Sequence, residues 1–453
     1  MRFHTFFGML EHWAEIDPDA PALIYENNGV KKTEKYAQLL AAVQTRAEEL
    51  KPCAGRCEAI LADGTRDCIV EVFAALKAGL PVALLDAGAP DEVLREQLKA
   101  CDTGLVWGSE DLCEDLAFTA LGQTAAKPGD VLFFTSGTTH RAKAVVLTEE
   151  SLCSSAYNGG ALLPLQPSDL LMCMLPLSHV FGFVCGLLWG LSCGASVALC
   201  RGVRHYLDDL AAFRPTALSA VPLLLGFLVQ HELLNPELKL VLVGAGDCPR
   251  PLLQRVKDRN IRVSFGYGLT ETSSGLALSL GPDPISMTVC PDDRIRIAED
   301  GEILVWAPTC VMKGYYKDEE ATRAAFTEDG WLLTGDLGRL DEEGRLIITG
   351  RKKDMLVFED GTKLFLPEAE AELAALLPGM ELALAQKEGK VFLHVFAPAA
   401  AGAEPVEPDE RNIKRRIVPW QDRQDRSHKI AGVTLHRQPL PRTATGKVRR
   451  WEL

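Results

Sequence analysis

Hydroxyl groups, one glycine and one lysine are gathered at 135–143, directly after the short apolar stretch Val131–Phe134. Backbone N–H groups and hydroxyls in a loop that follows a strand can surround phosphate oxygens without bulky side chains intruding. The loop is not a Walker A motif, because the spacing Gly-x4-Gly-Lys-Ser/Thr is absent. The competing interpretation is a polar surface turn. The candidate phosphate-binding residues are Thr135, Ser136, Gly137, Thr138, Thr139 and Lys143.

A second glycine-rich segment combines an aromatic ring, a hydroxyl and a carboxylate. Gly266 and Gly268 flank Tyr267, which would leave its ring open for stacking against a purine. Thr270 offers a hydroxyl to a phosphate, and Glu271 is a hard oxygen ligand suited to a Mg²⁺ ion that bridges phosphates. The alternative interpretation is a tight turn around one buried tyrosine.

The C-terminal segment is strongly basic although the chain is acidic. Residues 411–450 carry twelve Lys or Arg and two acids, whereas the whole chain has a formal net charge of −14. That net charge argues against non-specific nucleic-acid binding. Lys447 ends a turn-rich stretch, and a lysine on a mobile loop can neutralise charge that develops on a phosphate. We interpret the segment as a small domain that meets a polyanion such as ATP, pyrophosphate or CoA; a solvated basic face is the alternative.

The cysteines and the most apolar stretch both favour a cytoplasmic protein without a membrane span. Thirteen cysteines are scattered singly, and an odd count makes a poor disulfide framework, so buried reduced thiols are expected. No signal peptide opens the chain. The stretch 170–200 contains no formal charge but holds Pro176 and four glycines. This pattern predicts a strand, a turn, a buried helix and a second strand rather than a membrane helix.

The order of the elements predicts an α/β protein of two or three domains. The first ~125 residues alternate strands with helices, including a helix from Tyr36 to Leu50. Such alternation predicts parallel sheets layered with helices, with ligands at the carboxyl ends of the strands. We expect a large N-terminal domain over 1–350 with a small antiparallel β unit at about 289–350. A small, mobile α+β lid domain over 351–453 is expected to follow a hinge near 351–354.

In this order and spacing the segments resemble the adenylate-forming enzymes, from about Asp17 to Arg450. That family includes acyl-CoA synthetases, peptide-synthetase adenylation domains and beetle luciferases, and it joins a carboxylate to AMP using ATP. The motifs look closest to those of fatty acyl-CoA synthetases. The chain departs from the family in the phosphate loop, where His140, Ala142 and Ala144 stand in place of the usual Gly, Pro and Gly.

The resemblance implies a role for each matched residue. The hydroxyl-rich loop grips the β- and γ-phosphates, Asp336 takes both ribose hydroxyls, and Lys447 is the catalytic lysine of adenylation. A dinucleotide fingerprint is a rival for the segment at 244–246, but Pro249 occupies its third glycine position. The other assigned residues are Gly244, Ala245 and Gly246 near adenine and the acyl group, Thr270 and Glu271 at the α-phosphate and metal, Ile348 and Arg351 at the nucleotide, and Lys353 and Asp354 at the hinge.

The family also carries a histidine at the position of His179, beside the acyl channel. A lone histidine in an apolar run is more often a satisfied core residue. No acidic residue accompanies His179 between 176 and 182, and an α-amino group would need such a partner, so amino acids are disfavoured as substrates. Apolar neighbours suit an apolar acyl chain, and the pocket candidates are Phe181, Gly182, Val221 and Pro222.

Together these features predict a carboxylic acid–CoA ligase that acts on a fatty or other apolar acid through an acyl-adenylate. Its cofactors and co-substrates would be ATP, Mg²⁺ and CoA. One alternative is an enzyme that loads the acyl group onto the phosphopantetheine arm of a carrier protein, because both acceptors end in the same thiol. A second alternative, suggested by the altered phosphate loop, is a nucleotide-binding protein without catalysis.

Overall fold

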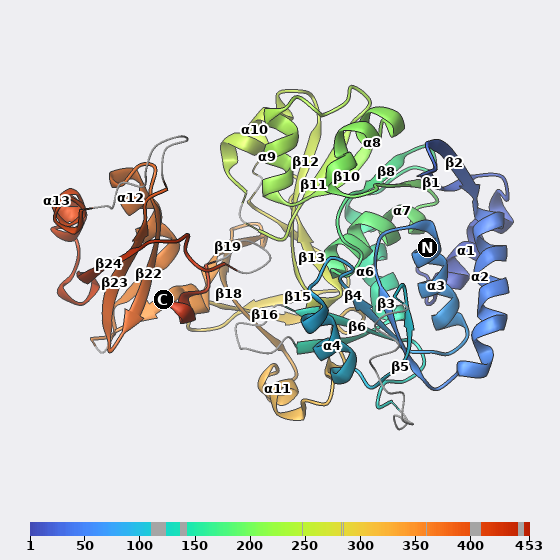
Figure 1. The fold of residues 1–453 in the computed structure, drawn as a ribbon, viewed down its shortest axis with the longest axis horizontal. Helices are drawn as coiled ribbons and strands as arrows, with labels where there is room; N and C mark the ends of the chain where they lie inside the picture. Colours follow the sequence, from blue (N-terminus) through green and yellow to red (C-terminus); the bar gives the residue numbers. More distant parts are fainter. Residues whose placement is uncertain are drawn as a thin grey trace. The chain divides into compact units, whose positions relative to one another are not determined.

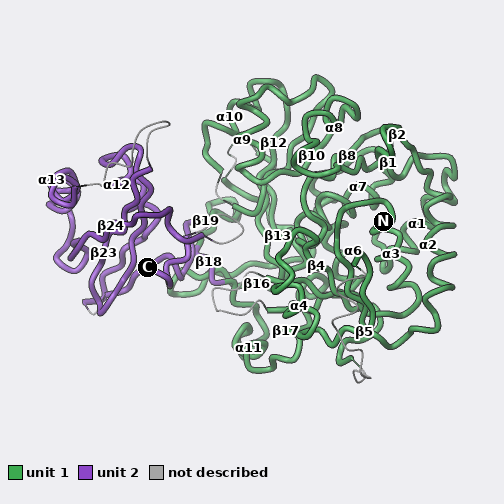
Figure 2. Tube along the Cα trace, viewed as in Figure 1, with its two compact units in different colours: residues 1–334, 338–348 green, residues 335–337, 349–453 purple. Residues whose placement is uncertain are grey.

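A computed structural model describes residues 1–109, 124–135, 143–246, 248–281, 283, 285–358, 360–398, 409–442 and 448–453. The chain forms two compact units (Figure 2). Unit 1 contains residues 1–334 and 338–348, and unit 2 contains residues 335–337 and 349–453. The boundary therefore passes within two strands, β18 (Leu332–Leu340) and β19 (Leu346–Arg351).

The larger sheet of unit 1 has nine strands and is mostly parallel. Its five inner pairings, from β12 through to β1, are all parallel, while the pairs at both edges are antiparallel. The order is β14 (Thr288–Val289), β13 (Ser274–Leu278), β12 (Arg262–Leu269), β11 (Leu240–Val243), β10 (Ala217–Ala220), β8 (Leu170–Cys173), β9 (Ser196–Leu199), β1 (Pro21–Asn27) and β2 (Val30–Lys35).

The second sheet of unit 1 has six strands and carries the hairpin that bounds the candidate phosphate loop. Its pairings β3–β4, β3–β5 and β4–β6 are parallel, and β6–β7 and β7–β17 are antiparallel. The order is β17 (Gly314–Tyr315), β7 (Lys143–Thr148), β6 (Asp130–Thr135), β4 (Val82–Leu85), β3 (Cys57–Leu61) and β5 (Thr103–Trp107). The prediction of parallel sheets in an α/β fold is confirmed.

Helices cover both faces of these sheets. In β11, Leu240 and Leu242 join the large core between the sheets, while Val241 and Val243 join a separate core on the other face, as alternation along a strand requires. Figure 1 shows α8 to α10 beside β10 to β12 on that other face. The helices in the separate core are α8 (Tyr206–Phe213), α9 (Pro222–Gln230) and α10 (Arg250–Lys257). The helices in the large core are α1 (Phe6–Ile16), α2 (Tyr36–Leu50), α3 (Arg66–Lys77), α6 (Glu149–Leu162) and α7 (Trp189–Ser192). The helix α4 (Asp91–Ala100) packs against the six-stranded sheet.

Two predicted segments are confirmed closely. The helix predicted at 36–50 is α2, and it buries Tyr36, Leu39, Val43, Ala47 and Leu50 at helical spacing. The apolar stretch 170–200 forms β8, a π-helical segment that continues into α7, and β9. No helix in the described part of the chain is both long and apolar enough to cross a bilayer.

Two other segments are strands although they contain glycines, which are typical of turns. β12 continues through Gly266 and Gly268 to Leu269 because the antiparallel neighbour β13 supplies its backbone partners. Residues 334–336 lie within β18, where Gly335 has a φ of 70°. In both cases the strand is completed by pairing with other strands of its sheet, which overrides the local turn signal of the glycines.

A smaller four-stranded sheet and the helix α11 (Glu319–Ala324) follow the nine-stranded sheet in sequence. The sheet order is β15 (Arg294–Ile297), β16 (Glu302–Trp306), β18 and β19, and β15 pairs antiparallel with β16.

Unit 2 is built on a three-stranded sheet whose core includes the fully buried Leu373, Leu393 and Trp420. Its elements are the hairpin β20 (Met355–Val357) and β21 (Lys363–Phe365), the sheet strands β22 (Glu381–Lys387), β23 (Lys390–Phe396) and β24 (Ile430–His436), and the helices α12 (Leu366–Leu376) and α13 (Glu410–Gln421).

Candidate active site

The ends of the candidate phosphate loop are held by the β6–β7 hairpin. Thr135 is the last residue of β6 and Lys143 is the first residue of β7, and the two stand directly opposite each other. The hairpin therefore fixes where the intervening loop leaves and re-enters the sheet. The other candidates in this loop, Ser136, Gly137, Thr138 and Thr139, lie outside the described residues.

Lys143 and Glu271 meet at a residue that the sequence analysis did not select, Tyr315. The Lys143 ammonium nitrogen lies 4.6 Å from the centroid of the Tyr315 ring, within range of a cation–π interaction. The Tyr315 hydroxyl donates a hydrogen bond of 2.8 Å to Oε1 of Glu271. Burial and the neighbouring carboxylate raise the pKa of the Tyr315 phenol, so it remains a donor at neutral pH.

The turn that carries Glu271 is held firmly. Thr270–Thr272 form one 3-10 turn, and the Glu271 carbonyl accepts a 2.8 Å hydrogen bond from the Met312 backbone. The next two residues have positive φ values, 52° at Ser273 and 100° at Ser274. Ser273 is anchored by a 2.7 Å hydrogen bond from its hydroxyl to the Cys310 carbonyl. A strained backbone conformation of this kind persists only where its surroundings determine it.

The donor set at Glu271 fits a Mg²⁺ ion that is shared with a nucleotide. Glu271 is partly exposed, and Tyr315 engages one of its carboxylate oxygens. Among the residues that the structure describes, no three His, Cys, Asp or Glu side chains form a group able to hold a metal alone. Magnesium is commonly bound through one or two carboxylates together with substrate phosphates and waters. Glu271 can supply the protein ligand in that arrangement.

The glycines around Tyr267 serve strand packing rather than an open aromatic face. The expectation of an open ring is wrong, because Tyr267 is only 7% exposed. A Cβ atom on Gly268 would stand 1.5 Å from the Ser274 carbonyl oxygen, where the β12–β13 register shifts. A Cβ atom on Gly266 would meet Leu278 at 3.2 Å. Glycine is required here because β13 approaches so closely.

The small-residue segment after β11 lies against two of the acyl-pocket candidates. A Cβ atom on Gly244 would meet the Phe181 ring at 3.0 Å, and one on Gly246 would lie 3.7 Å from Pro222. Ala245 between them has a φ of 62°, in the left-handed region. The structure therefore brings together two candidate groups that are far apart in sequence, one for the nucleotide side and one for the acyl side.

The segment around His179 has both an exposed and a tightly packed side. His179 is exposed, so it is not a satisfied core histidine. Its backbone carbonyl accepts a 2.9 Å hydrogen bond from the amide of Phe183. A Cβ atom on Gly182 would stand 2.2 Å from the Pro176 carbonyl oxygen, so this turn needs glycine. Val221, the N-cap residue of α9, is partly exposed.

Unit 2 contains a second pair of candidate residues in direct contact. The Asp336 side chain is 4% exposed, and its Oδ1 lies 3.0 Å from Nε of Arg351, which is 39% exposed. A carboxylate offers two acceptor oxygens, so Asp336 has the chemistry to accept hydrogen bonds from hydroxyl groups. Ile348, the neighbouring candidate, belongs to unit 1 and is partly buried.

The predicted hinge residues lie on one 3-10 turn, Lys352–Asp354, in unit 2. Desolvation and the nearby Arg351 lower the pKa of the Lys353 ammonium. Oδ1 of Asp354 lies 3.3 Å from Arg450, which also pairs with Glu370 at 2.8 Å. Arg450 was not selected from the sequence. The predicted catalytic residue Lys447 lies outside the described residues.

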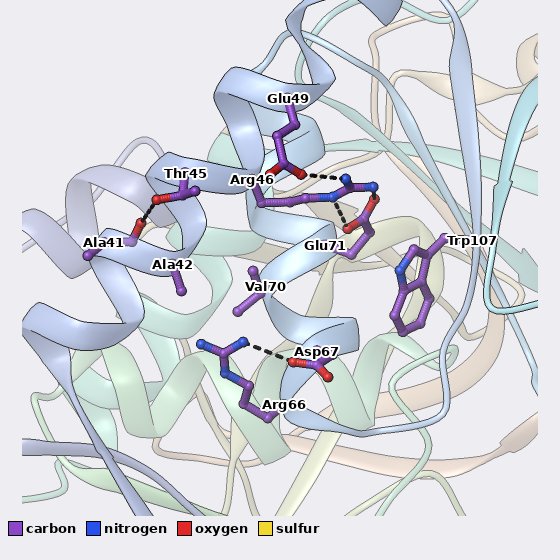
Figure 3. Close-up of a pocket in the computed structure, with 10 residues that line it drawn as sticks. All are labelled: Ala41, Ala42, Thr45, Arg46, Glu49, Arg66, Asp67, Val70, Glu71 and Trp107. Atoms are coloured by element: carbon purple, nitrogen blue, oxygen red, sulfur yellow. Dashed lines mark hydrogen bonds and ion pairs between the residues drawn. The ribbon is translucent and has the colours of Figure 1, made fainter.

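A surface pocket elsewhere in unit 1 contains none of the motif residues. It has a volume of about 580 Å³ and lies between α2 and α3 (Figure 3). Its two arginines are already paired, Arg46 with Glu71 and Glu49, and Arg66 with Asp67. The pair of Arg46 with Glu71 joins the two helices, whereas each of the other two pairs lies within one helix.

Sequence reasoning missed Tyr315 and Arg450 because their partners are distant in the chain. The hydrogen bond from Tyr315 to Glu271 spans 44 residues, and the contact of Arg450 with Asp354 spans 96. A weak signal was present in both cases. Tyr315 follows a glycine on an otherwise charged segment, and Arg450 belongs to the basic run that includes Lys447.

Comparison with known proteins identifies the family. The profile of the AMP-binding enzyme family matches residues 109–316. A 2-succinylbenzoate–CoA ligase of Bacillus velezensis is 31% identical over 402 residues, covering 80% of this chain and 81% of the relative. A long-chain-fatty-acid–CoA ligase of Mycobacterium tuberculosis, FadD13, is 28% identical over 393 residues, covering 80% and 76%.

Solved structures agree over nearly the whole chain. The o-succinylbenzoate coenzyme A synthetase of Bacillus subtilis in complex with ATP and magnesium ion has a TM-score of 0.79 at 26% identity, covering 98% of both chains. ATP-bound MatB from Rhodopseudomonas palustris shares the fold, with a TM-score of 0.81 at 22% identity. This chain therefore belongs to the AMP-binding family of adenylate-forming enzymes.

Proposed function

We propose that this chain is a carboxylic acid–CoA ligase that works through an acyl-adenylate. The observation that carries the proposal is the contact of Lys143 and Glu271 with the same side chain, Tyr315. This contact groups a cation from the phosphate-loop hairpin with a carboxylate suited to magnesium. Family membership supports the same reaction, because the relatives are named as CoA ligases.

In the first half-reaction, an oxygen of the substrate carboxylate attacks the α-phosphorus of ATP. The bond from that phosphorus to the bridging oxygen of pyrophosphate breaks, and pyrophosphate leaves. Lys143 would offset phosphate charge, and Lys447 would neutralise charge that develops at the α-phosphate. A Mg²⁺ ion held by Glu271 would supply further charge neutralisation. Asp336 would accept hydrogen bonds from the ribose hydroxyls.

In the second half-reaction, the thiolate of CoA attacks the acyl carbonyl. A thioester bond forms, the bond to the phosphate oxygen breaks, and AMP leaves. His179 is exposed on the segment that includes Phe181, and by position it would lie beside the acyl group. The hinge candidates Lys353 and Asp354 would allow unit 2 to serve the two half-reactions in turn.

The proposed substrate is an acid with an apolar body. Phe181 and Pro222 lie against the Gly244–Gly246 segment, so an apolar ring and a proline stand next to the backbone that would approach the nucleotide. The relatives are named for a succinylated aryl acid and for long-chain fatty acids. We therefore extend the expected substrate class from fatty acids to aryl acids, and the choice between them is an outcome of the test.

The test measures pyrophosphate release from Mg·ATP with a panel of fatty and aryl acids, including 2-succinylbenzoate, with and without CoA. Release should depend on one acid class, and CoA should stimulate it. Lys447→Ala should abolish release, whereas Lys429→Ala removes an exposed lysine of the same basic segment and should leave release unchanged. Stimulation by a phosphopantetheine carrier protein in place of CoA would favour the alternative acceptor.

One outcome would reject the proposed ligase, and another would reject only the role given to Lys447. Measurable ATP binding without pyrophosphate release for any acid would instead support a nucleotide-binding protein without catalysis. Equal loss of release in both lysine variants would show that general basicity, rather than the matched lysine, is needed.

A further inference from the structure

Tyr315 contacts both of the charged groups that the proposed reaction requires in unit 1. Its hydroxyl donates to Oε1 of Glu271 at 2.8 Å, and its ring lies 4.6 Å from the Lys143 ammonium. These partners come from two different sheets, because Lys143 begins β7 and Glu271 follows β12.

The backbone around Tyr315 is held in place by contacts on both sides. Tyr315 pairs with Val145 across the β17–β7 ladder, and its amide donates a 2.9 Å hydrogen bond to the Thr322 hydroxyl. The preceding Gly314 has a φ of 147°, and a Cβ atom there would stand 2.6 Å from Thr322. The strand is therefore fixed on both sides, which fixes the point at which the Tyr315 side chain leaves the backbone.

The two contacts of Tyr315 have separate chemical effects. The hydroxyl occupies one oxygen of Glu271 and so restrains the orientation of the carboxylate. The ring face attracts the ammonium group of Lys143 without using a hydrogen bond, so the lysine protons remain available for phosphate oxygens. One side chain can thus orient the metal ligand and the phosphate-loop cation together.

We propose that Tyr315 is a positioning residue that fixes the Glu271 carboxylate and the Lys143 ammonium relative to each other for a magnesium–nucleotide complex. The inference rests on the proposed function, since it deepens the account of the same site. Tyr315 would act through its two neighbours rather than touch the reacting atoms. Groups that hold a metal ligand in place commonly change metal affinity about 10–100-fold when removed.

The adjacent tyrosine provides a matched control. Tyr316 is also partly buried, and its hydroxyl donates to Asp102 at 2.6 Å and lies 3.0 Å from the Thr124 hydroxyl. Burial raises the pKa of Tyr316 to about 12. Replacing either tyrosine by phenylalanine removes one phenol hydroxyl from neighbouring positions of the same segment. Only the change at Tyr315 removes a bond to the proposed metal ligand.

The experiment compares Tyr315→Phe with Tyr316→Phe in the full chain. Binding of Mn²⁺ in the presence of α,β-methylene-ATP, which cannot release pyrophosphate, is followed by electron paramagnetic resonance. The Mg²⁺ concentration for half-maximal pyrophosphate release is measured in parallel. We expect Tyr315→Phe to weaken Mn²⁺ binding and to raise the Mg²⁺ requirement by about tenfold. Tyr316→Phe should leave both values unchanged.

A third variant separates the two contacts. Tyr315→Leu removes the ring as well as the hydroxyl, and it should add a rise in the KM for ATP because Lys143 loses its aromatic partner. Unchanged Mn²⁺ binding in Tyr315→Phe, or an equal loss in Tyr316→Phe, would overturn the proposal. Failure of the unmodified chain to release pyrophosphate would reject the proposed function instead, and the Mn²⁺ measurement would still decide the role of Tyr315.

Discussion

Replacing Arg450 by methionine should destabilise unit 2, because this side chain joins three of its elements. Arg450 donates to both carboxylate oxygens of Glu370 on α12, at 2.9 and 2.8 Å. It also donates to Asp354 at 3.3 Å and to the Leu384 carbonyl of β22 at 3.2 Å. Methionine keeps much of the length of the side chain but removes every donor.

The expected loss is about 2–3 kcal/mol in the free energy of unfolding of unit 2. Hydrogen bonds to charged groups contribute about 1.5–3 kcal/mol each, and removing one partner of a buried ion pair costs about 3–5 kcal/mol. We take a value below the buried-pair range because the Arg450 side chain is 27% exposed and Glu370 is 18% exposed. Water can therefore solvate part of the charge that loses its partner.

Hydrogen–deuterium exchange of peptides from α12 and β22 provides the assay, and Arg449→Met provides the control. Arg449 is 40% exposed and pairs only with Glu452 among the described acids, at 2.7 Å. A surface pair of this kind contributes about 0–1 kcal/mol. Faster exchange in Arg450→Met alone is expected. Equal exchange in the two variants would show that Arg450 does not join these elements, and the reasoning would be wrong.

Three further predictions follow from other parts of the structure. Gly268→Ala should cost more than about 3 kcal/mol, since its Cβ atom would stand 1.5 Å from a carbonyl oxygen; Gly275→Ala, with no atom within 4 Å, should leave the melting temperature nearly unchanged. Burial raises the pKa of Glu149 to about 7 from an ordinary value of 4.5. Between these two pH values the folded state keeps a proton on this carboxyl that the unfolded state releases, so the folded state loses stability as pH rises from about 4.5 to about 7. Glu149→Gln should therefore raise the melting temperature at pH 8 and change it little at pH 4.5, and a pH-independent effect would contradict this. Asp336→Asn should raise the dissociation constant of ATP by about tenfold or more in a fluorescence titration, and unchanged binding would remove Asp336 from the proposed ribose site.

The parallel core was predictable because its information is local. Strands such as β11 are short apolar runs, and α2 repeats its buried residues at helical spacing, so neighbouring residues determine each element. The antiparallel additions were not predictable in this way. The extension of β12 through Gly268 depends on β13, and the strand character of 334–336 depends on neighbouring strands of its sheet.

The residues of the candidate site also fall into those that the sequence could predict and those that depend on contacts made only in the fold. Residue types that suit phosphate and magnesium, such as Lys143 and Glu271, could be selected from the sequence because chemistry restricts the choice. The burial of Tyr267 could not be predicted, because the glycines beside it suit either an open ring or a close strand crossing. Tyr315 could not be placed at all without the fold, since its role depends on two partners from different sheets.

The distribution of cysteines makes the two units separable in a folding experiment. All thirteen cysteines occur at or before Cys310, so unit 2 contains no thiol. The twelve described cysteines are unpaired, and burial raises the pKa of Cys173 and Cys101 to about 12. Such thiols react with an alkylating reagent only after local or global opening exposes them. Pulsed alkylation followed at the buried Cys101 and Cys173 would therefore report opening of unit 1 alone. Comparing the alkylation rates in unit 1 with the hydrogen-exchange rates in unit 2 of the same unmodified chain would show whether the two units unfold together or one at a time.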